Sequence, residues 1–179
     1  MKKTLSTVLS AASRKDLRCL LIGGNAVILM GSARMTLDVD LLVPAEKRSQ
    51  WLDLMRELGF RLLHGSDAFA QFNPGSEGMA PVDLMFVDAA TWNHLNEEAR
   101  QEFIGDEPVR VPRIEHLIAL KLHAAGSTSR TAREQDWEDI RNMVRVWRLD
   151  PSDPYFRDLI LRHGGEDAMK RILGYRDES

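Results

Sequence analysis

The chain has 179 residues, of which 44% are hydrophobic and 28% charged, so it fits one ordinary globular domain with a sizeable core. A formal net charge of −3 excludes a whole-protein basic field of the kind that binds nucleic acid non-specifically. The single cysteine, Cys19, excludes an intrachain disulfide and a cysteine-rich metal site, and its apolar neighbours predict a buried, inert thiol.

The N-terminal segment does not have the pattern of a signal peptide. Its apolar residues are interrupted by serine and threonine, and it ends in charged residues. Nowhere does an apolar run approach the roughly 18 residues that are needed to cross a bilayer. The sequence therefore predicts a cytoplasmic protein that has no membrane partner.

Hydrophobic periodicity in the first 111 residues predicts a mixture of helices and strands. In chain order these are a helix over 4–15, a strand over 19–22, a helix over 25–31, a strand over 36–43, a helix over 45–58, strands over 60–64, 68–72 and 81–88, a helix over 91–103 and a strand over 108–111. Because consecutive strands interrupt the strand–helix alternation, a purely parallel doubly wound sheet is not expected.

After Pro112 the periodicity becomes helical throughout. The predicted helices cover residues 113–125, 132–147, 154–163 and 166–173. The predicted fold class is therefore α/β (α+β). A mixed sheet core occupies residues 1–111, and a helical part, residues 112–179, packs on it to form a single compact unit.

Two carboxylates interrupt the apolar strand predicted over 36–43. Side chains alternate along a strand, so Asp38 and Asp40 point to one face and their apolar neighbours point to the other. Two adjacent like charges repel each other, and partial burial raises that cost. A divalent cation explains the pair more simply than two cationic partners would, because Mg²⁺ binds hard carboxylate oxygens.

A third carboxylate, Asp83, alternates with apolar residues in the strand predicted over 81–88. If this strand lies beside the strand of Asp38 and Asp40, the three carboxylates converge and can hold two metal ions that clamp a phosphoryl transfer. Gly23 and Gly24 follow a buried strand and precede a helix. Such a turn is either an ordinary strand–helix connection or a nest of N–H groups that binds an anion.

Three segments, "IGGNAV", "RMTLDVDLLV" and "VDLMF", together resemble the nucleotidyltransferase superfamily of the DNA polymerase β type. The resemblance covers about residues 18–145 and is nearest to the AbiEii-like toxins and to small bacterial stand-alone domains. It implies that Asp38, Asp40 and Asp83 ligate Mg²⁺, with two ions expected and Mn²⁺ as an alternative. It also implies that Asp83 helps to activate an acceptor hydroxyl.

The resemblance also implies which residues contact the nucleoside triphosphate. Gly23 and Gly24 would cradle its phosphates, and Arg34 and Thr36 match the stretch before the D-x-D motif. Many relatives have a serine as the second residue of the turn, where this chain has Gly24, so a hydroxyl contact to phosphate is missing.

Lys121 falls on the apolar stripe of the helix predicted over 113–125. Its side chain either extends from the core to solvent or contacts the triphosphate, and the resemblance favours the second interpretation. Arg130 and Arg133 are further candidates for a phosphate or acceptor contact. Asp136 and Asp139 are interpreted as structural partners of arginines.

Taken together, the sequence predicts transfer of a nucleoside monophosphate from a nucleoside triphosphate, such as ATP, to an acceptor hydroxyl. RNA, a protein side chain and a small molecule all stay open as acceptors. The resemblance favours a toxin of a toxin–antitoxin system, with an antitoxin as its partner. The alternatives are an antibiotic adenylyltransferase of the aminoglycoside type and a non-catalytic binding module of the same fold.

Overall fold

The structure is a computed structural model that describes residues 2–32, 35–127 and 130–175. The chain divides into two compact units. The sheet unit consists of Met1–Ala26 and Arg34–Pro112, and the helical unit consists of Val27–Ala33 and Arg113–Ser179. Residues 27–33 thus belong to the helical unit, although they lie far from its other residues in the sequence.

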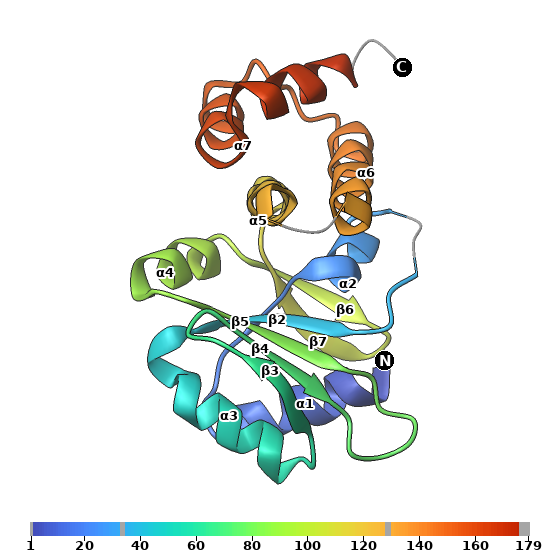
Figure 1. Cartoon of the computed structure of the whole chain (residues 1–179), viewed down its shortest axis with the longest axis vertical. Coiled ribbons are helices and arrows are strands. Elements are labelled where there is room, and N and C mark those ends of the chain that lie inside the picture. The colour runs from blue at the N-terminus through green and yellow to red at the C-terminus, as the bar shows by residue number, and fades with distance from the viewer. Residues whose placement is uncertain (1, 33–34, 128–129, 176–179) are drawn as a thin grey trace. The chain divides into compact units, whose positions relative to one another are not determined.

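The sheet unit contains most of the predicted alternation of helices and strands (Figure 1). Its helices are α1 (Lys2–Arg14), the 3-10 helix η1 (Ala45–Lys47), α3 (Arg48–Glu57) and α4 (Ala89–Glu97), and α2 (Gly23–Leu29) begins in it. Its strands are β1 (Leu20–Leu21), β2 (Val39–Pro44), β3 (Arg61–Gly65), β4 (Phe69–Asn73), β5 (Val82–Val87), β6 (Arg100–Ile104) and β7 (Glu107–Val111).

A five-stranded mixed sheet forms the centre of this unit, with the strand order β1-β2-β5-β4-β3. β2 and β5 pair in parallel, whereas β1–β2, β4–β5 and β3–β4 pair antiparallel. The sheet and the helices that follow it confirm the predicted α/β fold class, with a mixed sheet and a helical C-terminal half. The parallel pairing places the N-terminal ends of β2 and β5 side by side.

One face of this sheet is covered by α1 and α3 (Figure 1). Along β5 the residues alternate between buried and partly exposed, so that Val82, Leu84 and Phe86 are buried in the core while Asp83 and Met85 are not. Trp51 and Met55 of α3 are fully buried. The opposite face of β5 is therefore the one that carries the polar side chain predicted to be functional.

The helix predicted over 91–103 is wrong in its second half. α4 ends at Glu97, and Arg100–Ile104 form β6, which pairs antiparallel with β7. Gly105 has a φ of +67°, which suits the tight turn that joins the two strands. The hairpin therefore overrides the helical propensity of this segment, whose side chains are largely exposed and give no alternating pattern.

The helical unit is built from α5 (Ile114–Ser127), α6 (Arg130–Val146) and α7 (Pro154–Gly174), together with residues 27–33. Asp153 caps the N-terminus of α7 by accepting a hydrogen bond from the Phe156 amide, and Pro154 occupies its first turn. The non-helical backbone of Gly165 divides α7, as the two helices predicted there require. The buried residues of this unit include Ile118, Ile140, Met143, Ile160 and Ile172.

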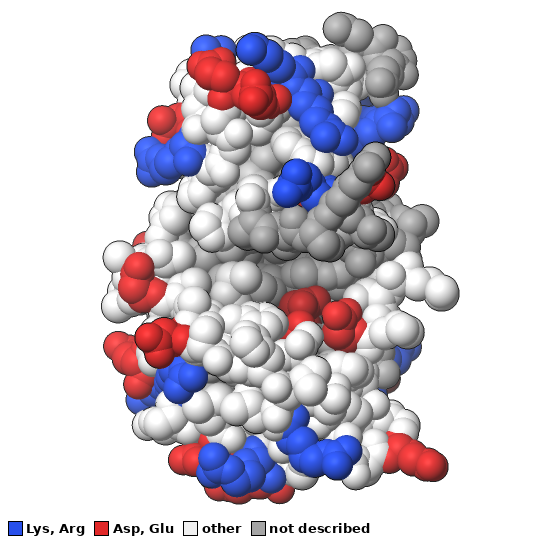
Figure 2. Space-filling model, viewed as in Figure 1, with Lys and Arg blue, Asp and Glu red and all other residues white. Residues whose placement is uncertain are grey.

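Two surface properties bear on the predicted partners. Within the described residues, no helix is long and apolar enough to cross a membrane. On the face shown in Figure 2, basic and acidic side chains are interspersed within each unit. This mixture agrees with the formal net charge of −3.

Candidate metal centre

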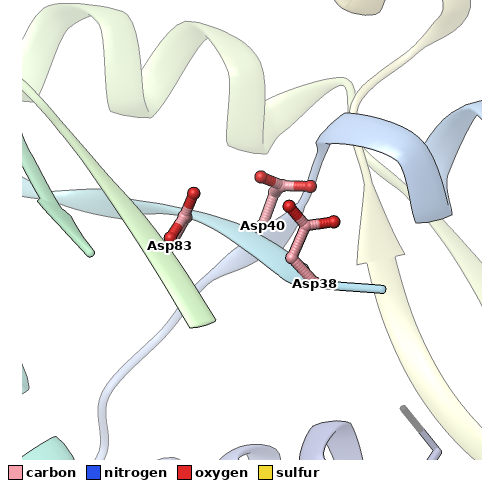
Figure 3. Close-up of side chains that lie close together, drawn as sticks. All are labelled: Asp38, Asp40 and Asp83. Atoms are coloured by element: carbon pink, nitrogen blue, oxygen red, sulfur yellow. The ribbon is translucent and has the colours of Figure 1, made fainter. Parts of the chain in front are cut away.

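The three carboxylates predicted from the sequence come together at the N-terminal ends of β2 and β5. Asp38 directly precedes β2, and Asp40 is its second residue. Parallel pairing puts Asp40 in register with Asp83 of β5, so the two side chains leave the same face of the sheet. Figure 3 shows the three side chains close together on this face.

One oxygen from each of Asp38, Asp40 and Asp83 lies within 4.8 Å of the other two. All three residues are partly buried, so water screens their mutual repulsion less than it would at an open surface. This spacing is short enough for the three carboxylates to share a divalent cation.

Two hydrogen bonds hold Asp38 in place. The Thr36 hydroxyl donates to Asp38 Oδ1 at 2.6 Å. The Asn25 side-chain amide, from α2, donates to the Asp38 backbone carbonyl at 2.7 Å, and Asn25 is buried. The start of β2 is therefore tied both to its own preceding residues and to the helix that follows the glycine turn.

Gly23 lies directly against Asp40. The Ile22 amide donates to the Asp40 carbonyl at 3.0 Å, and this bond holds the turn beside β2. A Cβ atom at Gly23 would collide with Asp40 Oδ2, and the φ of +62° at Gly23 is one that other residues rarely adopt. Only glycine fits this position, whereas Gly24 lies in the first turn of α2.

The two oxygens of Asp83 have different surroundings. Oδ2 accepts a long hydrogen bond of 3.4 Å from the Gln71 side-chain amide, whereas Oδ1 is buried and has no hydrogen-bond partner among the described residues. Burial, followed by the charge of Asp38, raises the pKa of Asp83 to about 6, and the Gln71 hydrogen bond opposes this rise.

These observations test whether a divalent cation fits the site. The donors are hard carboxylate oxygens, which Mg²⁺ and Mn²⁺ prefer. No described residue donates to the buried Asp83 Oδ1, and a cation would satisfy this oxygen and relieve the repulsion within the cluster. The cluster of Asp38, Asp40 and Asp83 therefore fits a divalent metal ion.

The remaining predicted contacts lie in several parts of the chain. Thr36 lies beside Asp38, as described above, whereas Arg34 falls outside the described residues. Arg133 is an exposed residue of α6. The backbone of Arg130 begins that helix, but its side chain also falls outside the described part. Their predicted contacts with phosphate or acceptor stay predictions.

Lys121 forms a partly buried ion cluster within the helical unit. Its Nζ lies 2.7 Å from Asp136 Oδ1 and 2.7 Å from Asp139 Oδ2. The exposed fractions of the three side chains are only 13%, 12% and 2% for Lys121, Asp136 and Asp139. The two aspartates, expected to pair with arginines, therefore bind this lysine and join α6 to α5.

Sequence reasoning missed two residues that support the carboxylates, Asn25 and Gln71. Asn25 is a polar residue in the otherwise apolar α2, and Gln71 is a partly exposed residue that alternates with buried ones in β4. Each pattern marks a polar side chain among apolar ones. Neither pattern identifies the carboxylate that the side chain contacts.

The mixed sheet, with Asp38, Asp40 and Asp83 on one face, shares the fold of solved nucleotidyltransferases. Among solved structures the chain is similar to the antibiotic-resistance factor ANT(2″)-Ia, with a TM-score of 0.62 and 18% identity, over 98% of this chain and 91% of that one.

It is also similar to the lincosamide antibiotic adenylyltransferase LnuA, with a TM-score of 0.59 and 17% identity, over 82% of this chain and 98% of that one. A third similar structure is an antigenic nucleotidyltransferase-like protein from Paracoccidioides brasiliensis, with a TM-score of 0.54 and 16% identity, over 94% of this chain and 92% of that one. Neither a protein-family model nor a curated protein sequence matches the chain. At these identities the similarities show the fold alone.

Proposed function

We propose that the protein is a metal-dependent nucleotidyltransferase that moves a nucleoside monophosphate from a nucleoside triphosphate to an acceptor hydroxyl and releases pyrophosphate. The observation that carries the proposal is the cluster of Asp38, Asp40 and Asp83, with oxygens within 4.8 Å of one another at the ends of two parallel strands. The nucleotidyltransferase fold supports the same reaction.

In this proposal Asp38 and Asp40 hold two divalent ions, Mg²⁺ or Mn²⁺, and Asp83 completes the second site. Bound ions would supply charge neutralisation at the transferring phosphoryl group and orient it. Asp83 would accept the proton of the acceptor hydroxyl.

The nucleotide would bind beside the glycine turn. Gly23, which approaches Asp40 closely, and Gly24 would offer backbone N–H groups to the phosphates. Arg34 and Thr36 would lie nearby, and Lys121, Arg130 and Arg133 would add cationic contacts from the helical unit. The contacts of Lys121 with Asp136 and Asp139 support a structural role for this lysine as the alternative.

The acceptor that we propose first is a small molecule with a free hydroxyl group. Two of the similar structures are named as an antibiotic-resistance factor and an antibiotic adenylyltransferase, and this favours an acceptor of that size. Transfer to RNA or protein by a toxin with an antitoxin partner is the second proposal, and the resemblance of the motif segments favours it.

The reaction is tested by incubating the protein with each of the four α-³²P-labelled nucleoside triphosphates, Mg²⁺ and one acceptor class at a time. The classes are aminoglycosides and lincosamides, total RNA, and cell lysate protein. We expect a labelled product that requires Mg²⁺ and is lost in the Asp40→Asn variant. A binding module would instead bind a nucleoside triphosphate and Mg²⁺ without releasing labelled product or pyrophosphate from any class, and that result would reject the enzyme proposal.

A further inference from the structure

Strand pairing continues the row of polar side chains beyond the carboxylates. Asp83 of β5 lies between two register partners, Asp40 on the parallel β2 and Gln71 on the antiparallel β4. Residues directly opposite one another on paired strands point to the same face of a sheet. Asp40, Asp83 and Gln71 therefore form one continuous row across three strands.

The hydrogen bond from Gln71 makes the two oxygens of Asp83 inequivalent. Oδ2 accepts the Gln71 amide at 3.4 Å, and Oδ1 is buried with no hydrogen-bond partner among the described residues. A buried acceptor without a donor destabilises the folded protein, and a ligand that satisfies it removes this cost. The carboxylate is thus held through one oxygen, and the other is left for a ligand.

A glutamine amide suits the position beside Asp83. An amide can donate a hydrogen bond to a carboxylate without adding charge, whereas a fourth carboxylate in the row would add repulsion to a cluster already under strain. A hydrocarbon side chain would leave both oxygens of Asp83 without a donor. Groups that hydrogen-bond to a metal-ligating carboxylate without touching the metal fix the orientation of that carboxylate and tune the metal affinity.

We propose that Gln71 is a positioning residue of the metal centre. It holds Asp83 by Oδ2, so that Oδ1 is presented to the cation shared with Asp38 and Asp40. The inference rests on the proposed function in one respect, which is that the cluster binds a divalent metal ion. In this proposal Gln71 is not a metal ligand and acts on the centre only through its hydrogen bond to Asp83.

The test is a Mn²⁺ titration followed by electron paramagnetic resonance, with and without a non-hydrolysable nucleoside triphosphate. Gln71→Met keeps a side chain of similar length and removes the donor. Asn73→Met is the matched control, because Asn73 is two residues further along β4 and is exposed. We expect Gln71→Met to weaken Mn²⁺ binding by roughly 10–100-fold and Asn73→Met to leave it unchanged.

The outcomes separate this inference from the proposed function. If the wild type binds Mn²⁺ and the dissociation constant of Gln71→Met is within about twofold of the wild-type value, Gln71 does not position Asp83. That result overturns the inference. If the wild type binds no Mn²⁺ even with the nucleotide analogue, the metal centre and this inference fail together.

A second measurement covers the case in which Gln71→Met does not fold, judged by its thermal melt in EDTA. In wild-type protein with ¹⁵N-labelled glutamine, Mg²⁺ should shift the side-chain amide resonance of Gln71 more than that of any other glutamine. Assignment uses the spectrum of Gln71→Asn, which loses one resonance. An unshifted Gln71 amide in protein saturated with Mg²⁺ would overturn the proposal.

Discussion

Asp40 combines two opposing contributions to stability. It repels two neighbouring carboxylates in the metal-free protein, and it offers an oxygen to a bound ion. We expect Mg²⁺ or Mn²⁺ at 100 times its dissociation constant to stabilise the wild type by about 2.7 kcal/mol, or roughly 5–10 °C in Tm. Asp40→Asn should lose most of this gain and should be at least as stable as the wild type in EDTA.

Thermal shift measurements with and without metal and nucleotide check this prediction. Asp67→Asn is the control, since Asp67 is exposed and lies outside the cluster. It should retain the full response to metal. A wild type with no metal response at saturating nucleotide would count against the enzyme proposal.

Asp83 should make the metal-free protein less stable as the pH rises. Its pKa is raised from 3.8 to about 6, chiefly by burial and then by Asp38, so the folded state binds this proton more tightly than the unfolded state. The free energy of unfolding therefore falls as the pH rises from about 4 to about 6. Above pH 6 this group causes no further change, and the stability does not return.

Asp83→Asn should remove this decline and be more stable than the wild type at pH 7.5. Urea unfolding in EDTA at pH 4.5, 6 and 7.5 measures the free energy of unfolding of both proteins, with Asp67→Asn again as the control. An equal pH dependence in wild type and Asp83→Asn would show that Asp83 titrates normally.

Gly23 and Gly59 form a matched pair of glycines with positive φ. A Cβ at Gly23 would collide with the Asp40 carboxylate, whereas a Cβ at Gly59 would meet no atom within 4 Å. Gly59→Ala should therefore cost only the backbone strain, about 1 kcal/mol. Gly23→Ala should cost more and should also remove the stabilisation by Mn²⁺, because Asp40 must move.

Thermal melts of both variants with and without Mn²⁺ make the comparison. Equal losses in the two variants, with Mn²⁺ stabilisation retained in both, would show that Gly23 is needed for its φ alone.

The sequence predicts the three carboxylates of the metal centre better than it predicts the side chains that donate hydrogen bonds to them. Strand alternation alone places Asp38 and Asp40 on one face, because the period of a strand is two. The approach of Asp83 depends on which strands pair, which the pattern of one segment does not determine. The contact of Gln71 depends on strand register, and that of Asn25 depends on the exact path of α2. The sequence pattern therefore does not predict either contact.

At the scale of elements, α5 and α6 are joined by the largely buried side chain of Lys121, which lies between two aspartates. Replacing Lys121 removes the amine that lies 2.7 Å from Asp136 Oδ1 and 2.7 Å from Asp139 Oδ2. We expect Lys121→Met to destabilise the protein by about 3–5 kcal/mol, which corresponds to roughly 6–20 °C in Tm.

Lys170→Met is the control for this variant, since Lys170 lies 4.0 Å from Asp167 at an exposed position of α7. It should change the free energy of unfolding by no more than about 0.5 kcal/mol. If Lys121→Met kept its stability and lost nucleotide binding, the phosphate role would replace the structural one.

The predicted helices of the C-terminal half and most of the predicted strands agree with the structure, whereas β6 differs from the prediction and α2 is shifted. The helices of the C-terminal half agree with the structure to within a few residues, and Gly165 divides the last one. The sequence predicts a helix in place of β6 because the side chains of β6 itself are largely exposed and give no buried face. α2 begins at Gly23 rather than at residue 25, because the glycine turn itself starts the helix.

At the scale of the whole molecule, the helical unit is discontinuous in sequence. Residues 27–33 belong to it, and the Trp147 indole donates to the Met30 carbonyl at 2.9 Å. Val27 and Met30 are buried. A fragment that ends at residue 112 would expose both side chains, at a cost of about 1.5–3 kcal/mol each.

We therefore expect the fragment 1–112 to aggregate or to bind a hydrophobic dye such as ANS, whereas the full chain does neither. Size-exclusion chromatography and dye fluorescence measure this. A monomeric fragment with a cooperative thermal transition would show that the sheet unit folds without the rest of the chain.

The pairing of β2 with β5 also sets when the metal site forms during folding. Asp40 and Asp83 are in register although 43 positions separate them in the sequence, the difference between 83 and 40, and the β3–β4 hairpin lies between them. Contacts of such long range form late, because the intervening loop must close first. A refolding chain should therefore acquire its ion-binding ability only in the last steps, and Mn²⁺ capture in a stopped-flow experiment would time the arrival of β5 beside β2.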